Sequence, residues 1–153
     1  MRKFFLTVGY SGLSPKAPGT VGSFVSLLLV MALIQIAHPS TIFLLALLIS
    51  VFAVKQINLY EQEVGEHDGK EIVIDELAGM WLAFTISGAT ADNYLILGVL
   101  SFVFFRIFDI YKPSIIGRID REVEGGWGVM GDDLVAGVFG GLCASLVNYI
   151  LFV

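Results

Sequence analysis

Long apolar segments alternate with shorter polar stretches along the 153-residue chain. Their length, and their content of leucine and alanine, favour helices over strands. The pattern therefore predicts an all-α, multi-helical and very apolar bundle with about five apolar helices, forming a single domain over residues 1–153. The expected apolar segments are residues 24–37, 41–54 with a helical extension to Tyr60, 77–91, 94–105 and 134–153.

The composition indicates a membrane. Hydrophobic residues make up 56% of the chain and the mean hydropathy is +0.83, against roughly 45–50% apolar residues in soluble domains. Only the last segment has the roughly 20 residues that cross a hydrocarbon core squarely. Two interpretations therefore stay open. In the first, the shorter segments cross the membrane because charged residues at their ends, such as Lys55 and Arg106, extend their side chains to the membrane surface. In the second, the chain is a soluble helical domain with a very apolar core.

The distribution of charge suggests an orientation. If every apolar segment crosses once, all nine lysine and arginine residues fall on one side, which is the positive-inside pattern of a cytoplasmic face. The net charge of -5, without a basic stripe, argues against a nucleic-acid partner. The single cysteine, Cys143, excludes an internal disulfide.

The stretch from Arg106 to Asp133 carries the strongest candidate chemistry. It holds four of the nine basic and six of the fourteen acidic residues, between two apolar segments. Arg106 and Asp109 stand three residues apart, so one helical face presents both, and Pro113 is expected to stop that helix. The glycines that follow permit turns that would bring Asp132 and Asp133 to the start of the last helix, where paired carboxylates suit a hard divalent cation. Helix capping with solvated loop charge explains the pair about equally well.

A second acidic pair, Asp75 and Glu76, interrupts the chain before the third apolar segment. Charge at the end of an apolar helix is costly unless it is paired, hydrated or bound to a metal. Glycines in the third and fifth segments, at 79, 137 and 141, allow close helix contact, which would bring the two acidic pairs together.

Two polar loops carry weaker signals. Residues 9–22 are rich in glycine, serine and proline and read as a loop before a helix that Ser23 is expected to cap. Its backbone amides are suited to an anion, although an ordinary capped turn is the commoner explanation. His67 and Asp68 form a possible proton donor and acceptor, although a solvated loop histidine is the simpler explanation.

Three blocks resemble, in order, the signature blocks of the bacterial phosphatidylglycerophosphatase A family: GLSPKAPGTVGS, HDGKEIVIDELAGMW and FRIFDIYKPSIIGRIDREVEGGWGVMGDDLVAG. They cover roughly 60 of the 153 residues, which makes accidental agreement improbable. The resemblance implies an Mg²⁺-dependent, all-helical phosphatase of the bacterial inner membrane, with its active site facing the cytoplasm. Its expected substrate is phosphatidylglycerophosphate, from which it would release phosphate to leave phosphatidylglycerol. One departure is Ile115, where many relatives carry a second proline.

The matching motifs suggest roles for individual residues. Asp75 is the candidate to position or deprotonate the attacking water, and a covalent route through Asp109 stays open. Arg106 and Lys112 are expected to clamp the phosphate oxygens. The remaining substrate-binding residues are expected to be Pro18, Gly19 and Thr20. The expected ligands of Mg²⁺ are Glu76, Asp109, Asp132 and Asp133.

Two rival classes of protein remain. One is another Mg²⁺-dependent membrane enzyme acting on lipid phosphates, such as a phosphatidyltransferase. The other is a non-enzymatic membrane subunit.

Overall fold

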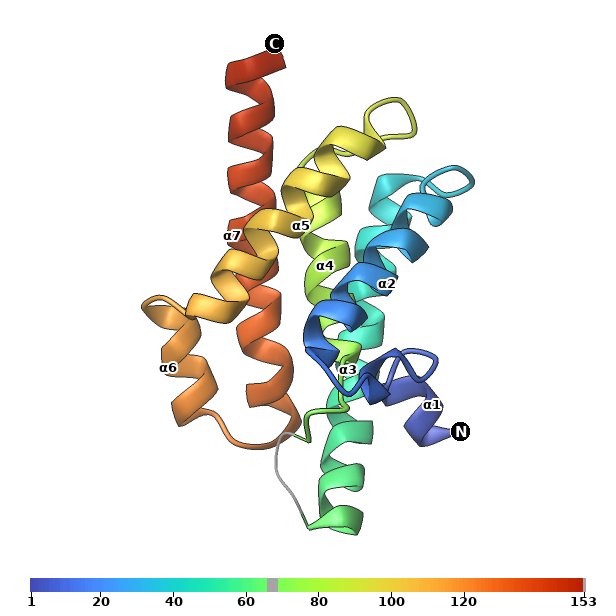
Figure 1. The fold of residues 1–153 in the computed structure, drawn as a ribbon, viewed down its shortest axis with the longest axis vertical. Helices are drawn as coiled ribbons and strands as arrows, with labels where there is room; N and C mark the ends of the chain where they lie inside the picture. The colour runs from blue at the N-terminus through green and yellow to red at the C-terminus, as the bar shows by residue number, and fades with distance from the viewer. Residues whose placement is uncertain (66–68, 153) are drawn as a thin grey trace.

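A computed structural model of the chain describes residues 1–65 and 69–152. Within these residues all regular secondary structure is helical, which confirms the predicted fold class (Figure 1). The elements are α1 (Arg2–Leu6), the short 3₁₀ helix η1 (Ser11–Leu13), α2 (Pro18–Leu33), α3 (Pro39–Val64), α4 (Ile74–Ile86), α5 (Tyr94–Tyr111), α6 (Ile115–Glu122) and α7 (Gly125–Phe152).

The short helix α4 forms the centre of the bundle. Ten of its 13 residues are buried, and it packs against α2, α3, α5 and α7. Trp81 of α4 fills core space, and its indole nitrogen donates a hydrogen bond of 3.0 Å to the carbonyl oxygen of Ser26 in α2. Since the surrounding helices cover α4 on all these sides, its acidic first turn is held within the protein.

Glycines bring α4 and α7 into close contact, as the sequence predicts. A Cβ atom built on Gly79 of α4 would lie 2.6 Å from the carbonyl oxygen of Asp133, and one built on Gly141 would lie 2.6 Å from that of Ala83. A Cβ atom on Gly137 would overlap the carbonyl oxygen of Gly79. The backbones of the two helices therefore touch directly, and Asp133 is one of the residues at this contact.

The charged stretches gather at one end of the bundle. Figure 1 shows the α2–α3 and α4–α5 connections at one end, and α1 and α6 toward the other. In the part of the chain that the structure describes, three helices are long and apolar enough to cross a membrane: α3, α5 and α7 over Gly125–Leu151. The expectation that only the last segment has this length was wrong, because α3 continues as a helix through polar residues to Val64.

The stretch 106–133 is more helical than expected. α5 continues to Tyr111, where the left-handed conformation of Lys112 and the following Pro113 end it, as predicted. α7 already begins at Gly125, which has φ +69°, so Asp132 and Asp133 lie about two turns inside the helix and not at its start. The next glycines, at 126, 128 and 131, lie within α7. Gly126 packs against the backbone of Val54 in α3, a contact that a side chain would block.

The N-terminal loop is shorter than expected. α2 begins at Pro18, a residue whose fixed φ suits the first position of a helix. Ser23 therefore lies inside α2 and does not cap it; its hydroxyl donates a hydrogen bond to the carbonyl oxygen of Gly19.

Candidate active site

A charged cavity of about 320 Å³ lies where the ends of α4, α5, α6 and α7 meet. Apolar and glycine residues such as Ile72, Val129 and Gly128 contribute to its wall, together with Pro18 from α2. Among the residues that the structure describes, its charged lining consists of six carboxylates and two lysines: Asp75, Glu76, Asp109, Asp120, Asp132, Asp133, Lys70 and Lys112.

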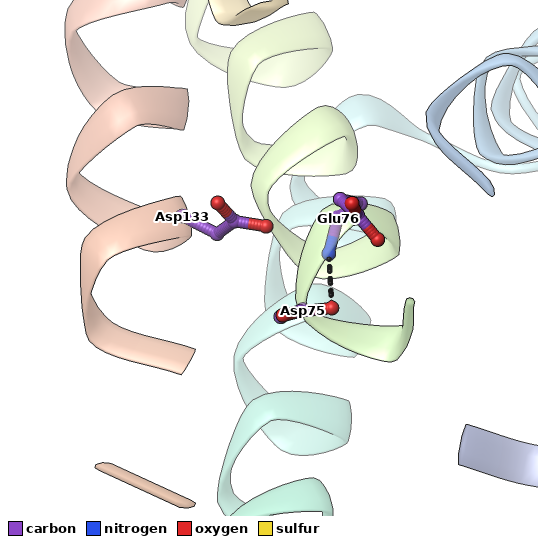
Figure 2. Close-up of side chains that lie close together, drawn as sticks. All are labelled: Asp75, Glu76 and Asp133. Atoms are coloured by element: carbon purple, nitrogen blue, oxygen red, sulfur yellow. Dashed lines mark hydrogen bonds between the residues drawn. The ribbon is translucent and has the colours of Figure 1, made fainter. Parts of the chain in front are cut away.

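Three of these carboxylates form a compact group. One oxygen from each of Asp75, Glu76 and Asp133 lies within 4.8 Å of the others. Figure 2 shows Asp133 reaching from α7 toward the first turn of α4. The Glu76 amide donates a hydrogen bond of 3.0 Å to Asp75 Oδ1, which orients the Asp75 side chain. Carboxylate oxygens at this spacing suit a hard divalent cation such as Mg²⁺, and the positive end of the α4 dipole faces the group.

Lys112 holds the neighbouring carboxylate, Asp132, outside this group. Asp132 is 5% exposed, and its Oδ2 accepts a hydrogen bond of 2.6 Å from Lys112 Nζ, which also donates to Asp120 at 2.5 Å. Burial alone would lower the pKa of Lys112, but the hydrogen bonds and charges of Asp120 and Asp132 outweigh burial and raise that pKa above its ordinary value. Lys112 is therefore a fixed positive charge in the cavity.

Arg106 joins three helices behind the cavity. Its guanidinium donates hydrogen bonds to Thr20 Oγ1 (3.1 Å), to Ser23 Oγ (3.2 Å) and to Asp109, three residues along α5 as the spacing predicts. The same group lies 3.8 Å from Glu76 Oε1. Arg106 is not among the described residues that line the cavity; it offsets the charge of the buried acids from behind.

The first turn of α2 closes one side of the site. Pro18 lines the cavity, and a Cβ atom on Gly19 would overlap Glu76 Oε1. A side chain at position 19 would therefore displace the Glu76 carboxylate from its place in the group. Thr20 contacts Arg106, so the motif Pro18 to Thr20 touches the site chiefly through Glu76 and Arg106.

The structure thus brings together Asp75, Glu76 and Asp133, of which Asp75 was expected in a different role. The other two expected metal ligands, Asp109 and Asp132, line the same cavity but form ion pairs with Arg106 and Lys112. His67 and Asp68 lie outside the described residues.

Sequence reasoning missed several residues around the site. Lys70 lines the cavity. Asn58 Oδ1 accepts a hydrogen bond of 2.6 Å from the Gly126 amide, and the Tyr60 hydroxyl donates one of 2.7 Å to Glu71 Oε1. The signal in the sequence was the run of polar residues that ends the otherwise apolar α3.

The fold and the cavity define a helical protein with three membrane-length helices and a carboxylate-rich site at one end. The family model for phosphatidylglycerophosphatase A matches residues 4–148, and the chain belongs to this family. The family suggested by the three sequence blocks is thereby confirmed.

Three curated proteins are similar to the chain over most of its length. The chain is 38% identical over 136 residues to phosphatidylglycerophosphatase A of Escherichia coli (strain K12), covering 87% of this chain and 76% of that protein. It is 28% identical over 145 residues to phosphatidylglycerophosphatase A of Haemophilus influenzae, covering 94% and 87%. It is 31% identical over 145 residues to a putative phosphatidylinositol-3-phosphatase of Bacteroides thetaiotaomicron, covering 92% and 89%. No solved structure matches the chain.

Proposed function

We propose that the protein hydrolyses the terminal phosphate monoester of phosphatidylglycerophosphate, releasing phosphatidylglycerol and inorganic phosphate, in glycerophospholipid biosynthesis. The reaction would require Mg²⁺ and take place at the cytoplasmic face of the bacterial inner membrane. The observation that carries the proposal is the group of Asp75, Glu76 and Asp133 beside the charged Lys112, at one end of three membrane-length helices. The names of two relatives state the same activity.

The three grouped carboxylates are the residues we assign to Mg²⁺. When bound, the cation draws in the dianionic phosphate and neutralises charge that develops on its oxygens. Asp109 and Asp132 remain possible further ligands, since both line the cavity.

Two positively charged side chains of the site, Lys112 and Arg106, have different roles. Lys112 is held between Asp120, a partly exposed residue, and the buried Asp132. Because a partly exposed ion pair is weak, an arriving phosphate can replace Asp120 as a partner of Lys112. Arg106 keeps Asp109 and the first turn of α2 in place, and through that arrangement it would support the phosphate as negative charge develops in the transition state.

Hydrolysis breaks the bond between phosphorus and the glycerol oxygen and forms one between phosphorus and the oxygen of water. Two routes fit the residues of the cavity. In the first, Asp75 orients the attacking water and accepts its proton, and the departing glycerol oxygen takes up a proton to become the hydroxyl of phosphatidylglycerol. In the second, Asp109 attacks phosphorus and water then cleaves the aspartyl phosphate. Acid quenching during a single turnover of ³²P-labelled substrate separates them, because only the second route leaves phosphate covalently bound to the protein at Asp109.

Purified protein in detergent micelles, incubated with phosphatidylglycerophosphate with and without Mg²⁺, tests the function by release of inorganic phosphate. Release without any added alcohol acceptor would exclude a phosphatidyltransferase. Asp133→Asn should lose the activity, while Asp92→Asn, at the opposite end of the bundle, should retain it. No phosphate release by the folded wild-type protein in Mg²⁺ would refute the proposal.

A second candidate substrate is phosphatidylinositol 3-phosphate, because one relative is named a putative phosphatidylinositol-3-phosphatase and matches 92% of this chain. Both lipids carry a phosphate monoester on a polyol. Comparison of kcat/KM for the two lipids in the same assay decides between them.

A further inference from the structure

We propose that Asn58 and Tyr60, near the end of α3, are positioning residues that fix α4 and α7 relative to each other and thereby hold Asp75, Glu76 and Asp133 together. The inference rests on the proposed function in that it concerns the same metal-binding acids. Neither residue is among the described residues that line the cavity, so both act through other groups.

Asn58 holds the start of α7. The first N–H groups of a helix have no partner within the helix, and they need acceptors from elsewhere. Asn58 Oδ1 accepts the hydrogen bond from the Gly126 amide at 2.6 Å. A Cβ atom on Gly126 would lie 2.5 Å from the carbonyl oxygen of Val54, one turn earlier in α3. Asn58 thus works as an N-cap that another helix supplies, at a point where the backbones of α3 and α7 touch.

The position of Gly126 determines that of Asp133. Seven residues separate them, which is about two helical turns, so both lie on the same face of α7. The face that α7 turns to α3 at Gly126 therefore carries Asp133 about 10 Å further along. A rotation or shift of α7 at Gly126 would move the Asp133 carboxylate away from α4.

Tyr60 holds the segment that leads into α4. Its hydroxyl donates a hydrogen bond of 2.7 Å to Glu71 Oε1, and this bond lowers the pKa of Glu71, so that the acceptor is a carboxylate. Glu71 precedes Asp75 by four residues. The Val73 amide of the same segment donates to the carbonyl oxygen of Leu6 at 2.9 Å, which gives the segment a second anchor.

The two residues act from one turn of α3. Residues two apart in a helix project about 200° apart, so Asn58 and Tyr60 face different neighbours. One is bonded to α7 and the other to the segment before α4. α3 therefore sets the separation of the two helices that carry the grouped carboxylates.

Mn²⁺ binding, measured by isothermal titration calorimetry on the full chain in detergent, tests this inference without the reaction. Asn58→Leu keeps the branched shape and the number of heavy atoms of the side chain and removes the acceptor. Since groups that orient metal ligands typically contribute 10–100-fold to metal affinity or activity, we expect Mn²⁺ affinity to fall at least about tenfold. In steady-state kinetics we expect kcat to fall with little change in the KM for the lipid. Asn58→Asp restores the acceptor and should restore both.

Gln56→Leu is the matched control. Gln56 lies in the same helix, and its Oε1 accepts a hydrogen bond of 3.3 Å from Arg2 in α1, away from the acids. Its loss should lower the melting temperature without changing Mn²⁺ affinity. Wild-type Mn²⁺ affinity in Asn58→Leu, or a loss no greater than in Gln56→Leu, would overturn the inference.

Tyr60→Phe removes only a hydroxyl and decides the matter if Asn58→Leu does not fold. We expect a several-fold loss of Mn²⁺ affinity, and an unchanged value would contradict the role of Tyr60. A wild-type protein that binds Mn²⁺ but releases no phosphate would refute the proposed function and leave the binding comparison decisive. A wild type that binds no Mn²⁺ would overturn both.

Discussion

Substitution of Gly79 by alanine tests how closely α4 and α7 must approach. The added methyl group would lie 2.6 Å from the carbonyl oxygen of Asp133 and 2.7 Å from Cε2 of Phe105. Ordinary contacts between such atoms are about 3.5 Å, so the two helices must separate by roughly 1 Å at this point. Both neighbours are poorly able to yield, since one is helix backbone and the other is a fully buried ring.

The expected magnitude combines two opposing effects. Overpacking of a tight contact costs about 1–3 kcal/mol, while the higher helix propensity of alanine returns up to about 1 kcal/mol. We therefore expect Gly79→Ala to lower the free energy of unfolding by roughly 1–2 kcal/mol. The displacement falls on Asp133 itself, so Mn²⁺ affinity should fall as well, by about tenfold or more.

Thermal melting and Mn²⁺ titration of the purified variant in detergent measure the two effects. Gly131→Ala is the control, because its methyl group meets only a side-chain methyl of Ile119 and lies in the same α7 helix. The methyl group would lie 3.0 Å from Ile119 Cγ2, so the Ile119 side chain must shift by a few tenths of an ångström. Because no backbone is displaced, the variant should keep wild-type Mn²⁺ affinity and change in stability by less than Gly79→Ala. If Gly79→Ala behaves like Gly131→Ala in both measurements, the backbone contact does not position Asp133.

Three further substitutions address single groups of the site. Asp133→Asn should abolish phosphate release and weaken Mn²⁺ binding by at least about 10²-fold while the circular dichroism spectrum stays helical; near-normal turnover at matched protein level would reject the metal site. Arg106→Lys keeps the charge but loses the planar fork that reaches Asp109 and α2 together, so we expect kcat to fall roughly 10²-fold with little change in KM, and a wild-type kcat would show that charge alone suffices. Tyr60→Phe should destabilise the protein near neutral pH. Because the Tyr60 hydroxyl lowers the pKa of Glu71, that stabilisation is complete above the ordinary carboxyl range and is lost as pH falls through the lowered pKa. Melting curves of both proteins should therefore converge in acid; a stability difference that persists there would contradict this origin.

The parts of the fold that follow from local chemistry were predictable. Apolar runs marked the long helices of the bundle, Pro113 marked the end of α5, and the spacing of Arg106 and Asp109 placed both on one helical face, where they form an ion pair. The helical start of α7 was not predictable in this way, because glycines disfavour helices. Contacts distant in sequence decide it, above all the packing of Gly126 against Val54 of α3.

The different partners of Asp132 and Asp133 could not be predicted from the sequence around them either. Asp132 and Asp133 are neighbours in sequence, but successive residues of a helix project about 100° apart. Only the packing of α7 determines that Asp133 meets Asp75 while Asp132 meets Lys112. The same packing also makes Asp75 a member of the carboxylate group, which adds a place in the metal site to its expected role beside the attacking water.

The charged lining of the cavity has a consequence for the stability of the whole protein. Among the described residues, six carboxylates line the cavity against two lysines and the neighbouring Arg106, which leaves an excess of negative charge in a confined space. The folded state without a cation therefore bears mutual repulsion that the unfolded chain largely escapes. A divalent cation that binds only the folded state removes this repulsion and raises stability by mass action, by about 2.7 kcal/mol at a hundredfold excess over its Kd. Folding and cation occupancy are therefore coupled in one equilibrium. The melting temperature of the protein therefore reports the fraction of molecules with a bound cation, and it can be measured without any lipid.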